Sequence, residues 1–375
     1  IYNKIPMHLK KIKKLIKNPG MFFRDYLNKK YPIINNEVTI PENDEYTLIR
    51  HDELLQKQDA QTAVSDTPID AVFTWVNNHD PVWQEKFQTA SQESRPYKQG
   101  RYAGDPARFA NHNELYYSVH SVLKYLPWIR NIYIITDNQT PEWLNARYHN
   151  VHIIDHTEII DRSYLPTFNS HIIEAHLHRI PDLSENFIYF NDDVFVARPL
   201  QRQHFFCNNN IASIFIATKS LRKMQEKGTD TPTLAASFNG IRLLKRHYNI
   251  NIDAPLVHTY VPLKKSIYEK AWQWYQVDIE AFLPNKLRSN QDLNLATFFV
   301  PWLMYLEGKS VPAREICYYF NIRSYNATAQ YQKLIERKII GQQPHSFCAN
   351  DFNSYGAIKD YSLFLNNFLK TYYSI

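Results

Sequence analysis

Four short runs of β-branched and aromatic residues lie in the middle of the chain and predict buried strands. These runs cover residues 69–76, 131–136, 151–154 and 187–190. Between them, segments 113–126 and 171–177 repeat apolar residues at the spacing of one helix face. Strands that alternate with helices are typical of an α/β fold, and near-continuous apolar strands favour a sheet covered on both faces. The pattern therefore predicts a mostly parallel sheet with flanking helices.

The pattern is less regular outside this core. In the second half of the chain it predicts one strand within 205–218 and helices over 264–283 and 325–338. Over residues 1–31, apolar residues alternate with lysines and a proline-glycine pair interrupts them. Such a segment is typical of a helix lying on a membrane surface. A helix packed on the body of the protein is the alternative.

These patterns divide the chain into four predicted parts. Residues 32–66 are polar with little periodicity, so they predict a linker. The basic helical segment 1–31 precedes it, and the α/β domain, 67–345, follows it. We expect residues 346–375 to form a helical extension at the C-terminus.

Composition narrows the class of protein only a little. The formal net charge is +6 over 375 residues, and the densest basic run is confined to the N-terminal segment. Because a nucleic-acid-binding domain is usually basic throughout, no nucleic-acid partner is expected. The three cysteines lie far apart, which argues against a disulfide framework and against a cysteine-based zinc site. This cysteine usage favours a reducing cytoplasm. No apolar run reaches about 18 residues, so no segment is expected to span a membrane, and a peripheral contact at the inner face of the cytoplasmic membrane is an option.

Polar residues follow three of the predicted strands at the point where each strand ends. They are Trp75-Val76-Asn77, Thr136-Asp137-Asn138 and Asn191-Asp192-Asp193. In open parallel sheets, ligands bind at the carboxyl ends of the strands. The adjacent carboxylates of Asp192 and Asp193 could hold a hard cation such as Mg²⁺, or one of them could act as a general base. A solvated turn with Asx hydrogen bonds is the alternative.

Other candidates for chemistry are scattered along the chain. Asp70 lies inside the first predicted strand, and a buried carboxylate is costly unless it is paired. It lies either at the ligand-binding mouth of the sheet or at the start of the strand, where it accepts backbone hydrogen bonds. Asn169 or Ser170 begins a predicted helix, and a helix N-terminus favours phosphate. Basic residues that could clamp phosphate oxygens, or lie on the surface, are His258, Lys265 and Arg288.

Four blocks in order resemble the Stealth family of hexose-1-phosphate transferases, which includes bacterial capsule polymerases. The blocks cover residues 69–77, 108–144, 165–194 and 258–292. Within the family the chain is most similar to polymerases that link N-acetylglucosamine-1-phosphate units, and residues 18–26 and 317–324 support this likeness. Three residues depart from the family pattern: Asn111 and Asn113, where aspartate is frequent, and His120, where arginine is usual.

The resemblance implies a capsular polysaccharide polymerase that transfers hexosamine-1-phosphate and forms phosphodiester links. It implies a UDP-hexosamine donor, an oligosaccharide-phosphate acceptor, release of UMP and a divalent metal, Mg²⁺ or Mn²⁺. It also implies functional roles for Asp70, Asp193, His258 and Arg288. A glycosyltransferase that releases UDP and a non-catalytic capsule-assembly scaffold at the membrane are the alternatives.

We expect a GT-A-like core whose sheet mouth holds the nucleotide-sugar. The predicted floor beneath the uridine comprises Asp70, Thr74, Trp75 and Asn77. Asp192 and Asp193 are the predicted metal ligands, and Asp193 or His258 is the candidate for proton transfer. Arg288 is expected to face the diphosphate together with Arg108. The other predicted substrate contacts are Asn169, Ser170, His171, Asn191 and Lys265.

Overall fold

The computed structural model describes residues 42–62, 67–93, 103–229, 231–351 and 358–375, together with residues 19, 20, 22 and 23. The chain divides into two units, Ile1–Asn35 and Asn36–Ile375. In the first unit the four described residues are helical, and the remainder of the predicted basic helical segment lies outside the described residues. All elements below belong to the second unit.

The main sheet has five strands in the order β3-β2-β1-β4-β8. They are β1 (Ile69–Thr74), β2 (Ile132–Thr136), β3 (Val151–Asp155), β4 (Asn186–Asn191) and β8 (Val261–Lys264). The first four are parallel, and β8 is antiparallel to β4. The central strands β1, β2 and β4 are buried along nearly their whole length, because their apolar residues point to both covered faces. The predicted α/β fold with a mostly parallel sheet is confirmed.

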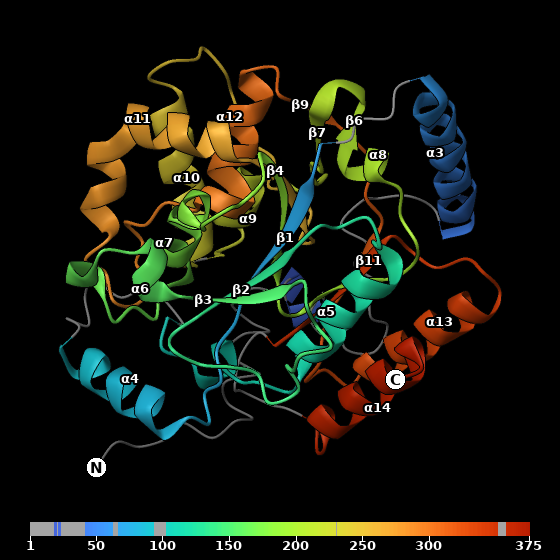
Figure 1. Cartoon of the computed structure of the whole chain (residues 1–375), viewed down its shortest axis with the longest axis horizontal. Helices are drawn as coiled ribbons and strands as arrows, with labels where there is room; N and C mark the ends of the chain where they lie inside the picture. The colour runs from blue at the N-terminus through green and yellow to red at the C-terminus, as the bar shows by residue number, and fades with distance from the viewer. Residues whose placement is uncertain are drawn as a thin grey trace. The chain divides into compact units, whose positions relative to one another are not determined.

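Helices lie on both sides of this sheet (Figure 1). At the upper left of the view are α10 (Pro232–Leu244), α11 (Lys265–Phe282) and α12 (Val300–Leu306). At the lower right are α5 (Glu114–Tyr125), α13 (Ala327–Ile339) and α14 (Tyr361–Tyr373). The short helix α7 (Ser170–Ala175) and the outlying α4 (Pro81–Glu93) complete the set nearest the site. Helices predicted over 113–126, 171–177, 264–283 and 325–338 correspond to α5, α7, α11 and α13.

A second sheet begins where the first one ends. Its strands are β5 (Val194–Val196), β11 (Ser346–Asn350) and β10 (Cys317–Asn321), with β11 in the middle. Only the Asp192-Asp193 turn separates β4 from β5, so this turn joins the two sheets. The predicted helical extension over 346–375 has its helix in α14 but begins with a strand, because β11 pairs with both of its neighbours. Its apolar run is too short to be told from a helix by periodicity.

Shorter elements fill the rest of the unit. A third sheet comprises β6 (Phe206–Cys207), β7 (Ile211–Ile214) and β9 (Ser310–Pro312), and β7 is the strand predicted within 205–218. The remaining helices are α6 (His156–Ile159), α8 (Arg202–Phe205), α9 (Leu221–Glu226) and the π-helical η5 (Leu295–Phe299). The 3₁₀ turns are η1 (Pro106–Arg108), η2 (Arg162–Tyr164), η3 (Leu177–Arg179) and η4 (Asn208–Asn210).

The predicted linker contains a long helix, α3 (Glu42–Thr62). Its sequence gives little helical signal because few apolar residues recur on one face. Polar contacts hold it instead: Glu45 accepts a hydrogen bond from Tyr318 at 2.6 Å, and Arg314 donates to Asp52 at 3.0 Å. Ile49 is the apolar anchor, buried against the core.

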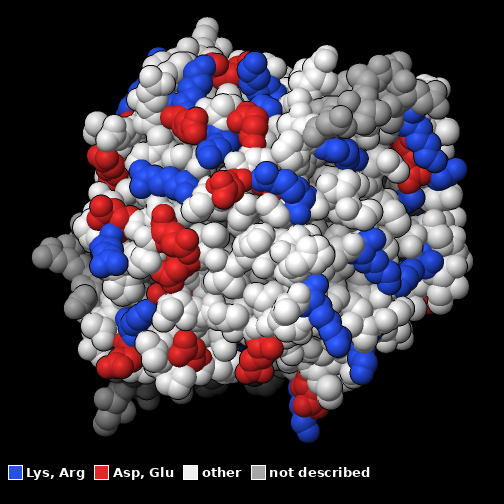
Figure 2. Space-filling model, viewed as in Figure 1, with Lys and Arg blue, Asp and Glu red and all other residues white. Residues whose placement is uncertain are grey.

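Charge is mixed on the face drawn in Figure 2. Basic and acidic side chains are interleaved at the upper left, over the helices α10 to α12. Two ion pairs of this region are Arg246 with Asp278 and Lys270 with Glu307. In the described part of the chain, no helix is both long and apolar enough to cross a membrane.

Candidate active site

The carboxyl ends of β1 and β2 are tied together by one side chain. Gln139, which follows β2, accepts a hydrogen bond from the Asn77 N–H at 2.8 Å and donates to the Asn77 carbonyl at 3.0 Å. It also donates to Asp80 at 3.0 Å. These bonds fix the loop after β1, which carries Trp75 and Asn77, over the end of the sheet.

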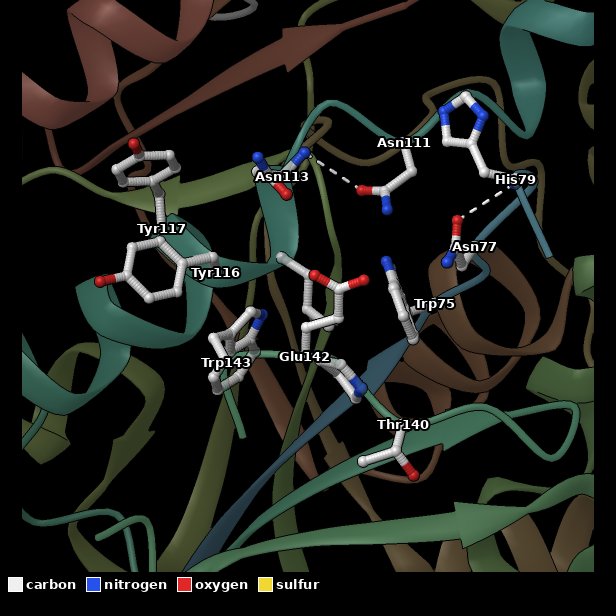
Figure 3. Close-up of a pocket in the computed structure, with 12 residues that line it drawn as sticks. Trp75, Asn77, His79, Asn111, Asn113, Tyr116, Tyr117, Thr140, Glu142 and Trp143 are labelled. Atoms are coloured by element: carbon white, nitrogen blue, oxygen red, sulfur yellow. Dashed lines mark hydrogen bonds between the residues drawn. The ribbon is translucent and has the colours of Figure 1, made fainter. Parts of the chain in front are cut away.

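A cavity of about 730 Å³ opens at this end of the sheet. It is lined by residues after β1, after β2 and at the start of α5: Trp75, Asn77, His79, Asn111, Asn113, Leu115, Tyr116, Tyr117, Thr140, Pro141, Glu142 and Trp143. Figure 3 shows the Glu142 carboxylate extending into the space between Asn113 and Trp75. The indole Nε1 of Trp75 is buried and has no hydrogen-bond partner among the described residues. The cavity thus offers aromatic walls and one unsatisfied donor, which suits a polar ligand with flat faces.

The turn after β4 carries two adjacent carboxylates. Asp193 Oδ2 accepts hydrogen bonds from Asn350 at 3.0 Å and from the Cys348 thiol at 3.4 Å. Its other oxygen, Oδ1, is buried without a partner in the described part of the protein. Removal from water raises the pKa of Asp192 to about 7, and the neighbouring charge of Asp193 contributes to the rise. Two close carboxylates with an unpaired oxygen form a site for a positive charge.

A third carboxylate, which sequence reasoning did not assign to the site, lies nearby. Glu114 begins α5 between two residues of the cavity wall, and its side chain is buried. Its carboxylate accepts the His112 N–H at 2.6 Å. Burial, with the charges of Asp192 and Asp193, raises the pKa of Glu114. Its position at the start of a helix was readable from the sequence, but its proximity to a strand end 78 residues away in the chain was not.

His258 reaches the same turn because of the direction of β8. This strand runs antiparallel to β4 and pairs Val261 with Tyr189, so the residues before it lie near the carboxyl end of β4. Ligand atoms of His258, Asp193 and Cys348 all lie within 4.8 Å of one another. The structure therefore brings two of the predicted catalytic residues together and adds Cys348 of β11.

Arg288 approaches from the other side of the site. Its guanidinium donates to Ser170 and, at 3.2 Å, to Thr233, while its Nε is buried without a partner in the described chain. Ser170 in turn donates to Glu174 at 2.9 Å, one helical turn further along α7. Ser170 thus contacts Arg288 directly, so both side chains can face the same ligand.

The other two predicted residues of this segment hold the Arg288 loop in place. Asn169 and His171 are fully buried, and both contact the carboxylate of Asp292, at 2.8 and 3.1 Å. Asp292 also accepts the Ser289 N–H at 2.9 Å. Asn169 and His171 therefore support the loop that carries Arg288 through their contacts with Asp292.

Arg108 lies close to Arg288. It is half-buried, and its guanidinium makes no hydrogen bond to a described residue. Burial and the charge of Arg288 lower the pKa of Arg108 to about 9, although Asp105 and Glu174 oppose this. Two neighbouring guanidinium groups with incomplete counter-charge are suited to bind an anion with several oxygens.

An aromatic cluster anchors both arginines through their sequence neighbours. It includes Trp83, Phe87, Phe109, Phe168 and Leu287. Trp83 of α4 stacks on Phe87 with ring centroids 5.1 Å apart, and it contacts Phe109 at 5.4 Å. Because Phe109 follows Arg108 and Leu287 precedes Arg288, this cluster fixes the backbone from which each guanidinium extends.

Tyr189 lies between Arg288 and the Asp192-Asp193 turn. Its buried hydroxyl contacts Thr74 and Asn191, each at 2.9 Å. Burial raises the pKa of Tyr189, and the charges of Glu174, Arg288 and Asp192 all act on it. Thr74 and Asn191 therefore lie at the junction of the two halves, and the site is continuous from Arg288 to Asp192.

Two predicted site residues lie elsewhere. Asp70 is at the amino end of β1, where its carboxylate accepts two hydrogen bonds from Arg130, at 2.9 and 2.6 Å, and the Ser184 N–H at 2.8 Å. Lys265 begins α11 beside Glu185, at the amino end of β4. The Asp192-Asp193 turn, called the acidic turn below, lies at the carboxyl end of β4. The amino ends of the parallel strands lie at the opposite edge of the sheet, so Asp70 and Lys265 do not share the site.

Known proteins match the chain over nearly its whole length. "Stealth protein CR1, conserved region 1" matches residues 67–95, and "Stealth protein CR2, conserved region 2" matches residues 108–214. Capsular polysaccharide phosphotransferase LcbA of Neisseria meningitidis is 60% identical over 368 residues, which covers 98% of this chain and 100% of the relative. A capsular polysaccharide phosphotransferase of Actinobacillus suis is 58% identical over 366 residues, covering 97% and 99%.

A solved galactosyltransferase, LgtC, aligns over 80% of this chain and 95% of its own, with 11% identity and a TM-score of 0.39. The sequence matches to the phosphotransferases define a transferase. The chain belongs to the Stealth family, together with the capsular polysaccharide phosphotransferases.

Proposed function

We propose that the protein transfers hexosamine-1-phosphate, with N-acetylglucosamine as the hexosamine, from a UDP-sugar to a hydroxyl of a growing capsular glycan. The acceptor is an oligosaccharide-phosphate, the new link is a phosphodiester, and UMP is released. The observation that carries the proposal is the convergence of Arg108 and Arg288 with Asp192, Asp193 and His258 at one edge of the sheet. This set combines positive groups for a diphosphate with candidates for proton transfer.

The aromatic cavity supports a place for the nucleotide. Trp75 presents a flat ring and a buried N–H without a partner in the described chain, and a uracil carbonyl would satisfy this donor. Asn77 and Thr74 lie along the same strand end as Trp75. The arginines on the side of α7 then face the diphosphate.

The acidic turn fits a divalent cation, Mg²⁺ or Mn²⁺. Asp193 Oδ1 is buried and unpaired among the described groups, and Asp192 lies beside it with a carboxylate destabilised by burial and by its neighbour. Oxygen ligands of this kind suit hard cations, so Asp192 and Asp193 would hold the ion. When bound, it would neutralise charge on the diphosphate.

The chain's own residues account for the transfer of the phosphoryl group. The acceptor hydroxyl attacks the β-phosphorus of the donor, and His258 takes its proton. The bond between this phosphorus and the bridging oxygen breaks, and UMP leaves with that oxygen. Arg108 and Arg288 balance the negative charge on the departing group, while Ser170 holds the Arg288 guanidinium.

Turnover of two variants tests this assignment. With UDP-N-acetylglucosamine, an oligosaccharide-phosphate and Mg²⁺, we expect Asp193→Asn and His258→Ala each to lose at least about a hundredfold in kcat, the lower range for general-base or electrostatic groups. The matched control is His247→Ala, because His247 is exposed and stacks on Trp274, 4.9 Å away. Near-wild-type turnover in both site variants would remove Asp193 and His258 from catalysis.

Two alternatives differ in what is released. A glycosyltransferase would attack the anomeric carbon of the same donor and release UDP. A non-catalytic scaffold at the membrane would release no nucleotide and would keep its membrane binding in Asp193→Asn. The names of the relatives favour phosphate transfer over both alternatives.

A further inference from the structure

Three side chains with different donor atoms meet beside the acidic turn. Asp193 comes from the end of β4, His258 from the segment before β8, and Cys348 from β11. A carboxylate oxygen, an imidazole nitrogen and a thiol sulfur from these residues lie within 4.8 Å of one another. Small side-chain rotations would bring all three to one metal ion, whose bonds to such donors are about 2.0–2.3 Å long.

The donor set does not match the cation proposed for the reaction. Mg²⁺ takes oxygen ligands and gains little from a thiolate or an imidazole. Borderline-soft ions such as Zn²⁺ bind Cys, His and Asp together, and three protein ligands with one open position are typical of reactive zinc sites. Asp193 Oδ1 is available to such an ion, because it is buried and has no partner among the described residues.

A second group with a similar composition provides a contrast. His204, Glu315 and His345 also bring ligand atoms within 4.8 Å, and all three are buried. Their atoms are already used: Glu315 accepts His204 at 2.7 Å and Tyr260 at 3.1 Å, and His345 Nδ1 accepts the Ile316 N–H at 3.0 Å. That group is a satisfied hydrogen-bond network, whereas the group at the acidic turn keeps an unpaired carboxylate oxygen.

We infer that Asp193, His258 and Cys348 form a binding site for a zinc-like ion, which shares Asp193 with the site proposed for the catalytic cation. Binding displaces the thiol proton of Cys348 to solvent, as thiolate ligation requires. The ion occupies Asp193 and His258, so it inhibits transfer even when Mg²⁺ is in excess. The inhibition rests on the proposed function of these two residues, whereas the binding does not.

Cobalt(II) is the probe for binding, because Zn²⁺ has a filled d shell and gives no visible signal. Titrating Co²⁺ into the full chain should produce a thiolate-to-cobalt charge-transfer absorption that saturates at one equivalent. Cys348→Ser should abolish this absorption. Cys207→Ser is the matched control and should keep it, since Cys207 lies outside the group.

Two outcomes of this titration would overturn the site: no thiolate absorption in the wild-type chain, or absorption that persists in Cys348→Ser. His258→Gln keeps the test decisive if Cys348→Ser does not fold. It should retain the thiolate absorption and weaken cobalt binding at least about tenfold, the smaller effect seen even for outer-shell partners. Unchanged affinity in His258→Gln would also overturn the site.

Inhibition is measured separately from binding. The Zn²⁺ concentration that halves UMP release in excess Mg²⁺ should rise at least tenfold in Cys348→Ser, relative to that variant's own rate without zinc. An unchanged concentration would reject the inhibitory role. If the chain releases no UMP but still shows the cobalt absorption, the proposed function fails and the binding site stands.

Discussion

Replacing Asp70 by Asn separates a role in the fold from a role in the reaction. The Asp70 carboxylate is fully buried and accepts four hydrogen bonds, from two nitrogens of Arg130 and from the N–H groups of Asn131 and Ser184. Asparagine has the same shape but one acceptor oxygen fewer. We therefore expect Asp70→Asn to lower stability without changing the chemistry.

The size of the effect follows from which bonds are lost. With the amide nitrogen in place of Oδ2, the buried Ser184 N–H loses its acceptor, which costs about 1–3 kcal/mol. The loss of charge costs less, about 0–1 kcal/mol, because the Arg130 side chain is 41% exposed and Arg130 keeps its bond to the Asp182 carbonyl at 2.6 Å. The sum is about 1–4 kcal/mol of unfolding free energy.

The assay compares Asp70→Asn with Asp193→Asn, the same chemical change at the acidic turn. Thermal melting should show a Tm several degrees lower for Asp70→Asn, with kcat per folded molecule within about threefold of wild type, since changes away from the site leave transition-state contacts intact. Asp193→Asn should melt near wild type and lose activity. A wild-type Tm with lost activity in Asp70→Asn would refute the placement of Asp70 outside the site.

Three further outcomes follow from the same geometry. Arg288→Ala should lower kcat/KM by about 10²–10³, the loss expected when one preorganised donor to developing charge is removed. Arg246 is exposed and paired with Asp278, so Arg246→Ala should keep the wild-type kcat/KM, and equal losses in the two variants would contradict the assignment. Burial lowers the pKa of His176 to about 4, so the unfolded chain binds more protons than the folded chain between pH 6.5 and 4. The free energy of unfolding therefore falls as pH falls through this range, by roughly 2 kcal/mol at pH 5. The drop in Tm from pH 7 to 5 should be smaller in His176→Asn than in the wild type, and an equal drop would show that another group causes it. Treatment with EDTA should abolish UMP release and Mg²⁺ should restore it, while turnover that survives EDTA would remove the cation from the account.

The strands and the acidic turn were readable from the sequence because they depend on local pattern. The apolar run before Asn191 indicates a buried strand, and polar residues at its end indicate a site edge. Asp70 shows where this reasoning stops. It is the second residue of β1, so its place in the strand indicates the amino end, whereas the resemblance to the family implies a functional role.

The partners of the acidic turn could not be predicted, because they depend on non-local pairing. Cys348 meets Asp193 only because β11 pairs antiparallel with β5, and residues 346–350 carry no signal of that register. Glu174 and Tyr189 are similar cases, since a buried Glu in a short helix and a Tyr in a strand are read as core positions. The local sign that Glu174 contacts Ser170 is its position one helical turn further along α7.

Phosphorus NMR of the products, with the released nucleotide identified in parallel, tests the claim on which the function depends. In the proposed function Arg108 and Arg288 support cleavage within the diphosphate. Incubation with UDP-N-acetylglucosamine, Mg²⁺ and an oligosaccharide-phosphate should then yield UMP and a new phosphodiester signal in equal amounts. Release of UDP, with no phosphorus transferred to the glycan, would contradict it.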